Sequence, residues 1–575
     1  MVDVAALARW RDARLRALLV APIVSLALSG PALPSGAAAQ EAGGPAAIRI
    51  PLTEVDAVPA TPVVGRPHSP QRLQRQTAKP ATAALPADAT SQHTLALPDR
   101  KLTFTAKAGA VAFEDEKGAV VAEIGYFAYL LDGAEARRRP VTFAVNGGPG
   151  SASAWLHVGA LGPWRVRITP EAARPTAPAD PLPNAETWLD FTDLVFIDPV
   201  GTGYSRLHQM AAAAAPSPAK DGKAEADTEA AKRLRRVAIT PDVKPLREKF
   251  WSIEGDIASI VVFIKRWLEA NGRTESPKVF LGESYGGFRA PRVAQSLQAM
   301  PGFALNGIVL VSPALSGMGF DPGLSNVLIK VTQFPSLAAT IADAKAPVSA
   351  QQLLAFEREA AGDYLADLLA GPRDKAANER LAQRIAAVTG LDAGTVRRLG
   401  PRSRAQVFLA ALDREHGRTH SAYDATAKRS AAYDGPALID GGDDLGVLST
   451  QLARAMGNLG KRHLAWSPGR DYLVRGQGAS WSWFGQESVS ALRSVLVRDP
   501  TFRTLIVHGY ADLVTPYFRT KLILDQMPTI GTDNRVRLEI YGGGHMFYSR
   551  DDSRVLFRRH ALQFFEEVAS PRASR

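Results

Sequence analysis

One short segment constrains the fold of this chain more than any other: Gly282-Glu283-Ser284-Tyr285-Gly286, which fits the pattern G-x-S-x-G. An apolar run at 279–281 precedes it, and residues 290–298 follow with helical spacing. A serine held between a strand and a helix sits in a strained turn, so the residues two before and two after it must be glycine or very small. The segment therefore predicts that Ser284 is a nucleophile at the end of a strand.

Further apolar runs alternate with helical patterns along the chain. The runs are 141–145, 194–197, 308–311, 505–507 and 536–541, and residues 256–269 have helical spacing. This alternation is typical of a mostly parallel sheet covered by helices. Short alternating runs on both sides of the turn at 115–118 predict antiparallel hairpins at the edge of that sheet.

A serine hydroxyl needs a general base and a group that orients the base. His545 stands out among ten histidines because three glycines precede it directly after the run 536–541, and Asp512 follows the run 505–507 in the same way. An open α/β sheet keeps its active site at the carboxyl ends of its strands. Since the order Ser, Asp, His is that of an α/β-hydrolase, we predict this α/β fold with Ser284, Asp512 and His545 as catalytic residues.

Five segments resemble the serine carboxypeptidase family, which includes cathepsin A and fungal and plant enzymes. In family order they are Asn146-Gly147-Gly148-Pro149-Gly150, Leu161-Gly162-Pro163, the segment 196–205, Gly282-Glu283-Ser284-Tyr285-Gly286-Gly287 and Gly543-Gly544-His545-Met546. The resemblance spans about residues 100–315 and 500–565. It implies a peptidase that releases C-terminal residues from peptides through an acyl-enzyme on Ser284.

The resemblance also implies the roles of residues around the serine. The backbone N–H groups of Gly148 and Tyr285 would form the oxyanion hole, and glycine lets a backbone donor approach an oxyanion closely. Asn146, the backbone of Gly147 and Glu283 would bind the C-terminal carboxylate of the peptide. In the family the counterpart of Glu283 does so as a protonated acid, which favours work at acidic pH. The alternative for Glu283 is a buried structural carboxylate.

Three departures from the family leave other functions open. The family's second carboxylate-binding Glu falls on Ala160, the Cys after the glycine loop is Ser151, and Phe288-Arg289 stands where His-Tyr is usual. Arg289 or His157 is a candidate for a positive partner of the substrate carboxylate. The alternatives are an esterase or acyltransferase that uses the same triad, and a non-catalytic binding protein on a hydrolase scaffold.

Composition excludes several classes of protein. The chain has no cysteine, so it has no disulfide, thiolate metal site, cysteine nucleophile or lipid-anchored cysteine. The net charge of +11 comes from scattered basic residues, which favours a solvated surface over a nucleic-acid site. His416 and His420 are four residues apart, but Gly417 lies between them and no third ligand is evident, so we predict no metal. No cofactor is expected, and the oligomeric state is left open.

The chain divides by composition into five parts. Residues 1–39 have the positive, apolar and small-residue order of a signal peptide, and residues 40–92 form an Ala/Pro-rich leader. Residues 93–316 and 501–575 carry the two parts of the hydrolase core, with a mobile insertion at 211–245. Residues 317–500 form a mainly helical cap, with helical patterns at 350–361, 376–388 and 405–412. We expect a secreted or periplasmic protein that acts on peptides and has no stable membrane anchor.

Overall fold

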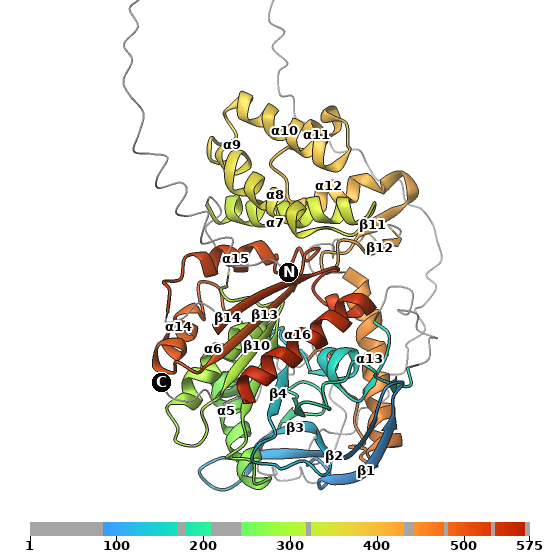
Figure 1. Cartoon of the computed structure of the whole chain (residues 1–575), viewed down its shortest axis with the longest axis vertical. Coiled ribbons are helices and arrows are strands. Elements are labelled where there is room, and N and C mark those ends of the chain that lie inside the picture. Colours follow the sequence, from blue (N-terminus) through green and yellow to red (C-terminus); the bar gives the residue numbers. More distant parts are fainter. Residues whose placement is uncertain are drawn as a thin grey trace, which may run out of the picture. The chain divides into compact units, whose positions relative to one another are not determined.

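The computed structural model describes residues 84–168, 179–208, 243–317, 324–430, 442–476, 481–530 and 535–569. Within these ranges, ten strands form one sheet at the centre of the chain from Ala81 onward (Figure 1). In spatial order they are β1 (Ala89–Ala96), β2 (Lys101–Glu114), β3 (Val120–Leu131), β7 (Asp193–Ile197), β4 (Val141–Val145), β9 (Lys278–Glu283), β10 (Gly307–Val311), β13 (Arg503–Gly509) and β14 (Val536–Tyr541), with β8 (Arg206–Leu207) beside β3. The predicted signal peptide, most of the leader and most of the insertion at 211–245 lie outside the described residues.

Strands β1, β2 and β3 are antiparallel and form the predicted hairpins at one edge of the sheet. The side chain of Asp115 closes the turn between β2 and β3 by accepting the N–H groups of Lys117 and Ala119, both at 2.9 Å. Strand β1 begins at Ala89, inside the segment predicted as leader, so the boundary at 92 was wrong. Most of its side chains are polar or exposed, and pairing with β2 makes it a strand. A weak hydrophobic pattern cannot reveal such an edge strand.

The remaining strands from β7 to β14 pair in parallel, which confirms the predicted α/β class. Strands β4, β9, β10 and β13 are buried along their whole length because helices cover both faces of the sheet. Helices α5 (Ile253–Ala270), α6 (Tyr285–Gln298) and α14 (Val489–Arg498) pack with residues such as Phe280 and Ile308. Helices α13 (Gly442–His463) and α16 (Asp551–Ala569) pack with residues of the opposite face, such as Leu281 and Val309.

A long insertion lies between the neighbouring strands β10 and β13. Its first part contains α7 (Leu324–Asp343), α8 (Ala350–Glu359), α9 (Leu365–Leu369), α10 (Lys375–Thr389), α11 (Ala393–Leu399) and α12 (Ala405–Leu412), followed by the hairpin of β11 (Arg418–His420) and β12 (Lys428–Ser430). These helices share an apolar cluster with Tyr510, Tyr517 and Phe518 of the hydrolase core. In Figure 1 they gather beyond α15 (Tyr517–Asp525), next to the ends of β13 and β14.

The sequence predicts one cap over residues 317–500, but the second part of the insertion packs on the core instead. Helix α13 packs on the core through Leu452, Met456 and Leu459, and α14 packs on it through Leu492 and Val495. The separate helical layer therefore ends by residue 430. Helical spacing shows that a segment has an apolar face, but it does not show which surface covers that face.

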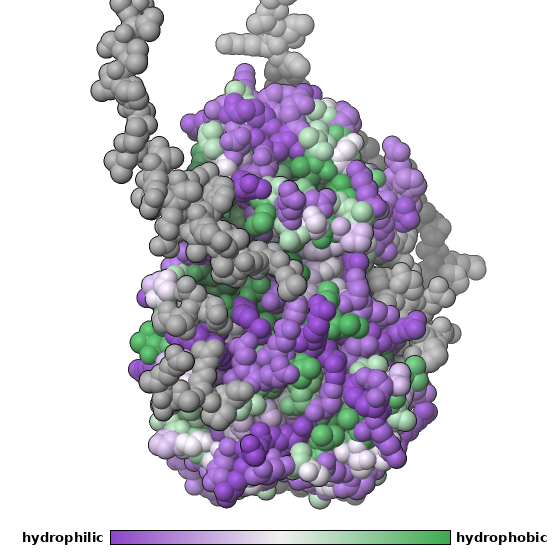
Figure 2. All heavy atoms as spheres, viewed as in Figure 1, coloured by the Kyte–Doolittle hydropathy of each residue, from purple (hydrophilic) through white to green (hydrophobic). Residues whose placement is uncertain are grey.

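The face of the molecule in Figure 2 is mainly hydrophilic, with small apolar areas between charged ones. None of the described helices is long and apolar enough to span a lipid bilayer.

Candidate active site

Ser284 stands between β9 and α6 in the strained turn that the sequence predicts. Its φ of 59° and ψ of −119° lie in a region that residues other than glycine rarely adopt. The turn is fixed by the Ser284 N–H, which donates to Val311 O at 2.9 Å, and by the Ser284 carbonyl, which accepts from Ala314 N at 3.0 Å. A Cβ on Gly282 would lie 2.0 Å from the carbonyl oxygen of Gly286. The motif glycines are therefore required by the approach of strand and helix.

His545 and Asp512 lie on loops that follow β14 and β13, and the structure brings them together. The Nδ1 atom of His545 lies 2.8 Å from Oδ2 of Asp512. The other oxygen of Asp512 accepts the backbone N–H groups of Val514 and Thr515 at 2.8 and 3.0 Å. The hydroxyl of Thr515 donates to Asp512 Oδ2 at 2.7 Å. These bonds hold the carboxylate so that it fixes the orientation of the imidazole and leaves Nε2 for a reacting group.

The charges of this pair shift both pKa values in the direction that favours an ion pair. Burial by itself lowers the pKa of His545, but the charge and hydrogen bond of Asp512 and the charge of Glu283 raise it above its ordinary value. Burial by itself raises the pKa of Asp512, whereas His545 and the hydrogen bonds from Thr515 lower it below its usual range. The site therefore stabilises a protonated imidazole, as a general base requires after it accepts a proton.

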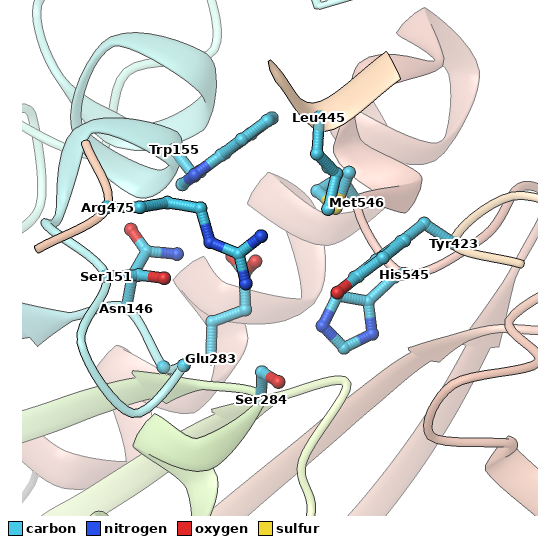
Figure 3. Close-up of a pocket in the computed structure, with 12 residues that line it drawn as sticks. Asn146, Ser151, Trp155, Glu283, Ser284, Tyr423, Leu445, Arg475, His545 and Met546 are labelled. Carbon is cyan, nitrogen blue, oxygen red and sulfur yellow. The ribbon is translucent and has the colours of Figure 1, made fainter. Parts of the chain in front are cut away.

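Ser284 and His545 line one pocket of about 520 Å³, its open mouth included. In Figure 3 the Ser284 side chain points into this pocket toward the imidazole. No hydrogen bond joins the two side chains within the described residues, and in substrate-free enzymes such contacts are often long and tighten when substrate binds. The pocket is lined by Asn146, Gly147, Gly148, Ser151, Trp155, Glu283, Ser284, Tyr423, Leu445, Arg475, His545 and Met546. It is large enough for a small ligand or the end of a peptide.

The loop that follows β4 comes close to the serine. A Cβ on Gly147 would lie 2.5 Å from the N atom of Tyr285 and 2.9 Å from Cβ of Ser284, so only glycine fits there. Gly148 has a φ of 107° and also lines the pocket. Within the described residues, the backbone N–H groups of Gly148 and Tyr285 donate no hydrogen bond to the protein. Two free donors thus belong to segments that meet beside the Ser284 side chain.

Glu283 is buried next to Ser284 and lines the same pocket. The Tyr548 hydroxyl donates to its Oε2 at 2.8 Å. Burial raises the pKa of Glu283 to about 7, although the charge of His545 and hydrogen bonds from Tyr548 and Asn146 act in the opposite direction. The carboxyl can therefore carry a proton at mildly acidic pH and donate it in a hydrogen bond to another carboxylate.

The structure excludes both residues that the sequence offered as positive partners for a substrate carboxylate. The guanidinium of Arg289 is fully buried, donates to Asp256 Oδ2 at 2.6 Å and to the backbone oxygen of Asn146 at 2.5 Å, and so supports the loop from behind. His157 stacks on Phe196 with ring centroids 4.1 Å apart, and burial lowers its pKa to about 3. It is neutral at any physiological pH. Both suggestions were wrong because a sequence does not show whether a basic residue already has a partner.

Other predicted residues also have defined places. Ala160 is buried in an apolar cluster and brings no polar side chain to the pocket. The side chain of Tyr285 points away from the pocket, with its hydroxyl accepting from Trp481 Nε1 at 3.1 Å. His420 bonds to Asp413 Oδ2 at 2.9 Å and to Ala425 O at 2.6 Å, so it is paired and not solvated. Within the described ranges, no three residues of the metal-binding types gather in one place.

Sequence reasoning missed several residues that surround the serine. Thr515 and Tyr548 lie within three residues of Asp512 and His545, and this proximity was the signal that could have found them. Tyr423 comes from the helical insertion. Its backbone oxygen accepts the His545 N–H at 2.5 Å, and its ring lies edge-on to the imidazole. Trp155, Leu445 and Arg475 belong to no motif, and only the fold brings them to the pocket.

The parallel sheet, the strained serine turn after β9 and the histidine after the last strand define an α/β-hydrolase. A sequence model of the family described as serine carboxypeptidase matches residues 98–318. This part of the chain, which contains Glu283 and Ser284, is therefore similar to the serine carboxypeptidase family.

Solved structures of other hydrolases are similar to this chain at low identity. Kex1, a prohormone-processing carboxypeptidase from Saccharomyces cerevisiae, is 14% identical, with 80% of this chain and 91% of that chain covered and a TM-score of 0.49. A proline iminopeptidase from Mycobacterium smegmatis is 15% identical over 83% of this chain and 99% of that chain, with a TM-score of 0.32. A thermophilic esterase from Thermogutta terrifontis is 13% identical over 80% and 99%, with a TM-score of 0.31. No curated protein matches the sequence.

Proposed function

We propose that the chain is a serine carboxypeptidase that removes C-terminal residues from peptides through an acyl-enzyme. The observation that carries the proposal is one pocket in which Ser284, the imidazole of His545 and the buried carboxyl of Glu283 converge. Asp512 holds the imidazole from behind at 2.8 Å. The triad supplies the chemistry of acyl transfer, and Glu283 distinguishes a carboxypeptidase from a general hydrolase.

The reaction follows from these positions. Ser284 Oγ attacks the carbonyl carbon of the last peptide bond while Nε2 of His545 accepts the hydroxyl proton. The N–H groups of Gly148 and Tyr285 bind the negative oxygen of the tetrahedral intermediate. The C–N bond then breaks, the imidazolium gives its proton to the leaving nitrogen, and an ester with Ser284 remains. Water attacks this ester with the same proton transfers, and the shortened peptide and free serine are released.

The wall of the pocket beside the serine recognises the C-terminal end of the substrate. Glu283, when protonated, donates a hydrogen bond to the terminal carboxylate of the substrate, and Asn146 and the backbone of Gly147 line the same side. The pKa of Glu283, raised to about 7 by burial, supports this role, since such a carboxyl is largely protonated at mildly acidic pH. The signal-like order of residues 1–39 supports a secreted or periplasmic location for the enzyme.

Two measurements test the proposal. A fluorophosphonate probe should label the wild-type protein and fail to label Ser284→Ala, which reports on the nucleophile alone. An N-acylated dipeptide should be cleaved much faster with a free C-terminal carboxylate than as its C-terminal amide. Equal rates on the acid and the amide would overturn the carboxypeptidase assignment and leave the triad intact. Unchanged peptide cleavage by Ser284→Ala would overturn the triad as well.

An esterase or acyltransferase that uses the same triad is the second candidate. Ala160, in an apolar cluster, brings no polar group to bind a terminal carboxylate, and the pocket residues Trp155, Leu445 and Met546 suit an apolar acyl group. Hydrolysis of short-chain p-nitrophenyl esters with kcat/KM far above that of every peptide acid would favour this candidate.

A further inference from the structure

Arg475 is the only arginine among the described residues that line the pocket, and its backbone is fixed there. Residues 474–476 lie antiparallel to the loop after β4, with a bridge between Arg475 and Ser151. Ala152 N donates to Val474 O at 2.9 Å, and Gly476 N donates to Gly150 O at 2.8 Å. The segment that carries Arg475 is therefore joined on both sides to the loop that carries Asn146, Gly147 and Gly148.

The side chain of Arg475 reaches into the pocket without a partner in the described part of the chain. Figure 3 shows its guanidinium extending from the Ser151 side over the space beside Glu283. It forms neither a hydrogen bond nor an ion pair with Glu283 or any other described residue, and Arg475 is exposed to solvent. Arg289, also near this loop, is by contrast fully paired.

A free guanidinium beside a nucleophilic serine has a specific chemical preference. Its planar fork of N–H donors matches the two oxygens of a carboxylate, and it keeps its charge at every pH at which a protein is folded. Bidentate contacts of this kind are short and about twice as strong as hydrogen bonds between neutral groups. In this pocket the carboxylate cannot come from Glu283, whose side chain is held by Tyr548.

We propose that Arg475 binds the α-carboxylate of the substrate's C-terminal residue, together with Asn146 and Glu283. The inference rests on the proposed carboxypeptidase function and names the group that selects its substrates. Asn146 and Arg475 approach the ligand from two paired segments, and Glu283 approaches it from the end of β9. A charged donor here does what the side chain of Ala160 cannot do, since that side chain is a buried methyl group.

The test compares acid and amide substrates in variants of Arg475. The substrates are an N-acylated dipeptide ending in Phe and its C-terminal amide, and the readout is the ratio of kcat/KM for acid over amide. In Arg475→Gln this ratio should fall roughly 10- to 100-fold, mostly through a higher KM for the acid, because a hydrogen-bonded charge pair is lost. Arg475→Lys, which keeps the charge but not the fork, should have an intermediate ratio.

Arg138→Gln is the matched control, because it removes one arginine charge far from the chemistry. Arg138 precedes the start of β4, at the opposite end of that strand from Asn146, and its side chain is 85% exposed. Its acid-to-amide ratio should equal that of the wild type. Fluorophosphonate labelling of Ser284 in each variant shows that the site is folded. If Arg475→Gln is not labelled, the ratio in Arg475→Lys decides: an intermediate value supports the proposal, and the wild-type value overturns it.

The outcomes separate this proposal from the proposed function. A wild-type enzyme that prefers the acid, with an unchanged ratio in Arg475→Gln, overturns the role of Arg475 and leaves the carboxypeptidase standing. A wild-type enzyme that is indifferent to the acid overturns the carboxypeptidase before any variant is made. Further substrates with Glu as the last residue show whether the guanidinium binds the α-carboxylate or a side-chain carboxylate. If Arg475→Gln slows only these substrates, the guanidinium binds the side chain, and the assignment to the α-carboxylate is wrong.

Discussion

Replacing Glu283 by Gln should make the protein less dependent on acidic pH for its stability. Burial raises the pKa of Glu283 from 4.5 to about 7. A tenfold change in proton affinity is worth about 1.4 kcal/mol, so the ionised form costs the folded state about 3 kcal/mol more than it costs the unfolded chain. Because the folded state binds the proton more tightly, this stabilisation is fully present below pH 4.5 and is lost as the pH rises through about 7.

Glutamine cannot ionise, so Glu283→Gln lacks this pH-dependent contribution. Its carbonyl still accepts the hydrogen bond that the Tyr548 hydroxyl donates at 2.8 Å in the wild type. Any other change in packing or hydrogen bonding shifts the free energy of unfolding by nearly the same amount at each pH. We therefore expect the difference between variant and wild type to move by about 3 kcal/mol in favour of the variant between about pH 4.5 and about pH 8.

Urea unfolding followed by tryptophan fluorescence measures this difference, since the chain has nine tryptophans. Wild type and Glu283→Gln are unfolded at several values across this pH range, and the two free energies are subtracted at each pH. The subtraction cancels every other titrating group that the two proteins share. A difference that stays constant to within about 1 kcal/mol would show that the pKa of Glu283 is ordinary. The reasoning from burial would then be wrong, and with it the neutral acid in the proposed mechanism.

Two further predictions concern the triad and the oxyanion loop. Asp512→Asn should lower kcat on the peptide acid on the order of 10³- to 10⁴-fold with a modest change in KM, because an amide no longer holds the imidazole in the required tautomer. A loss below about tenfold would contradict the role of the 2.8 Å contact with His545. Gly147→Ala should lower kcat roughly 10²- to 10³-fold, because its Cβ would meet the N atom of Tyr285 at 2.5 Å and displace a donor of the proposed oxyanion hole. Gly457→Ala, where no atom lies within 4 Å of the new Cβ, should keep the wild-type kcat, and equal losses in the two variants would refute the steric argument.

Much of the fold was predictable because its central strands are continuous apolar segments. The predicted runs 141–145 and 536–541 coincide with β4 and β14. Strands β9, β10 and β13 extend the predicted runs by one or two residues at one or both ends. Strand β1 was missed because its side chains are mostly polar and its pairing partner defines it. The extent of the helical layer was overestimated because α13 and α14 have apolar faces that pack on the sheet.

Some residues of the candidate site could be predicted from their neighbours in the sequence, and others could not. The strained turn of Ser284 and the close approach of Gly147 are steric requirements of short segments, so the glycines around them are visible in the sequence. Thr515 and Tyr548 were overlooked although they lie beside predicted residues, because a hydroxyl side chain gives no sign of its partner.

The sequence by itself determined the α/β class and indicated Ser284, Asp512 and His545 as the candidate triad, because local sterics and hydrophobic periodicity act over a few neighbouring residues. Only the tertiary structure decided which charges are available. It pairs Arg289 with Asp256, removes the charge of His157 by burial and leaves the guanidinium of Arg475 in the pocket. The charge and hydrogen bonding of a side chain depend on burial and on partners that are distant in the chain. For that reason the residue proposed to select the substrate lay outside every motif.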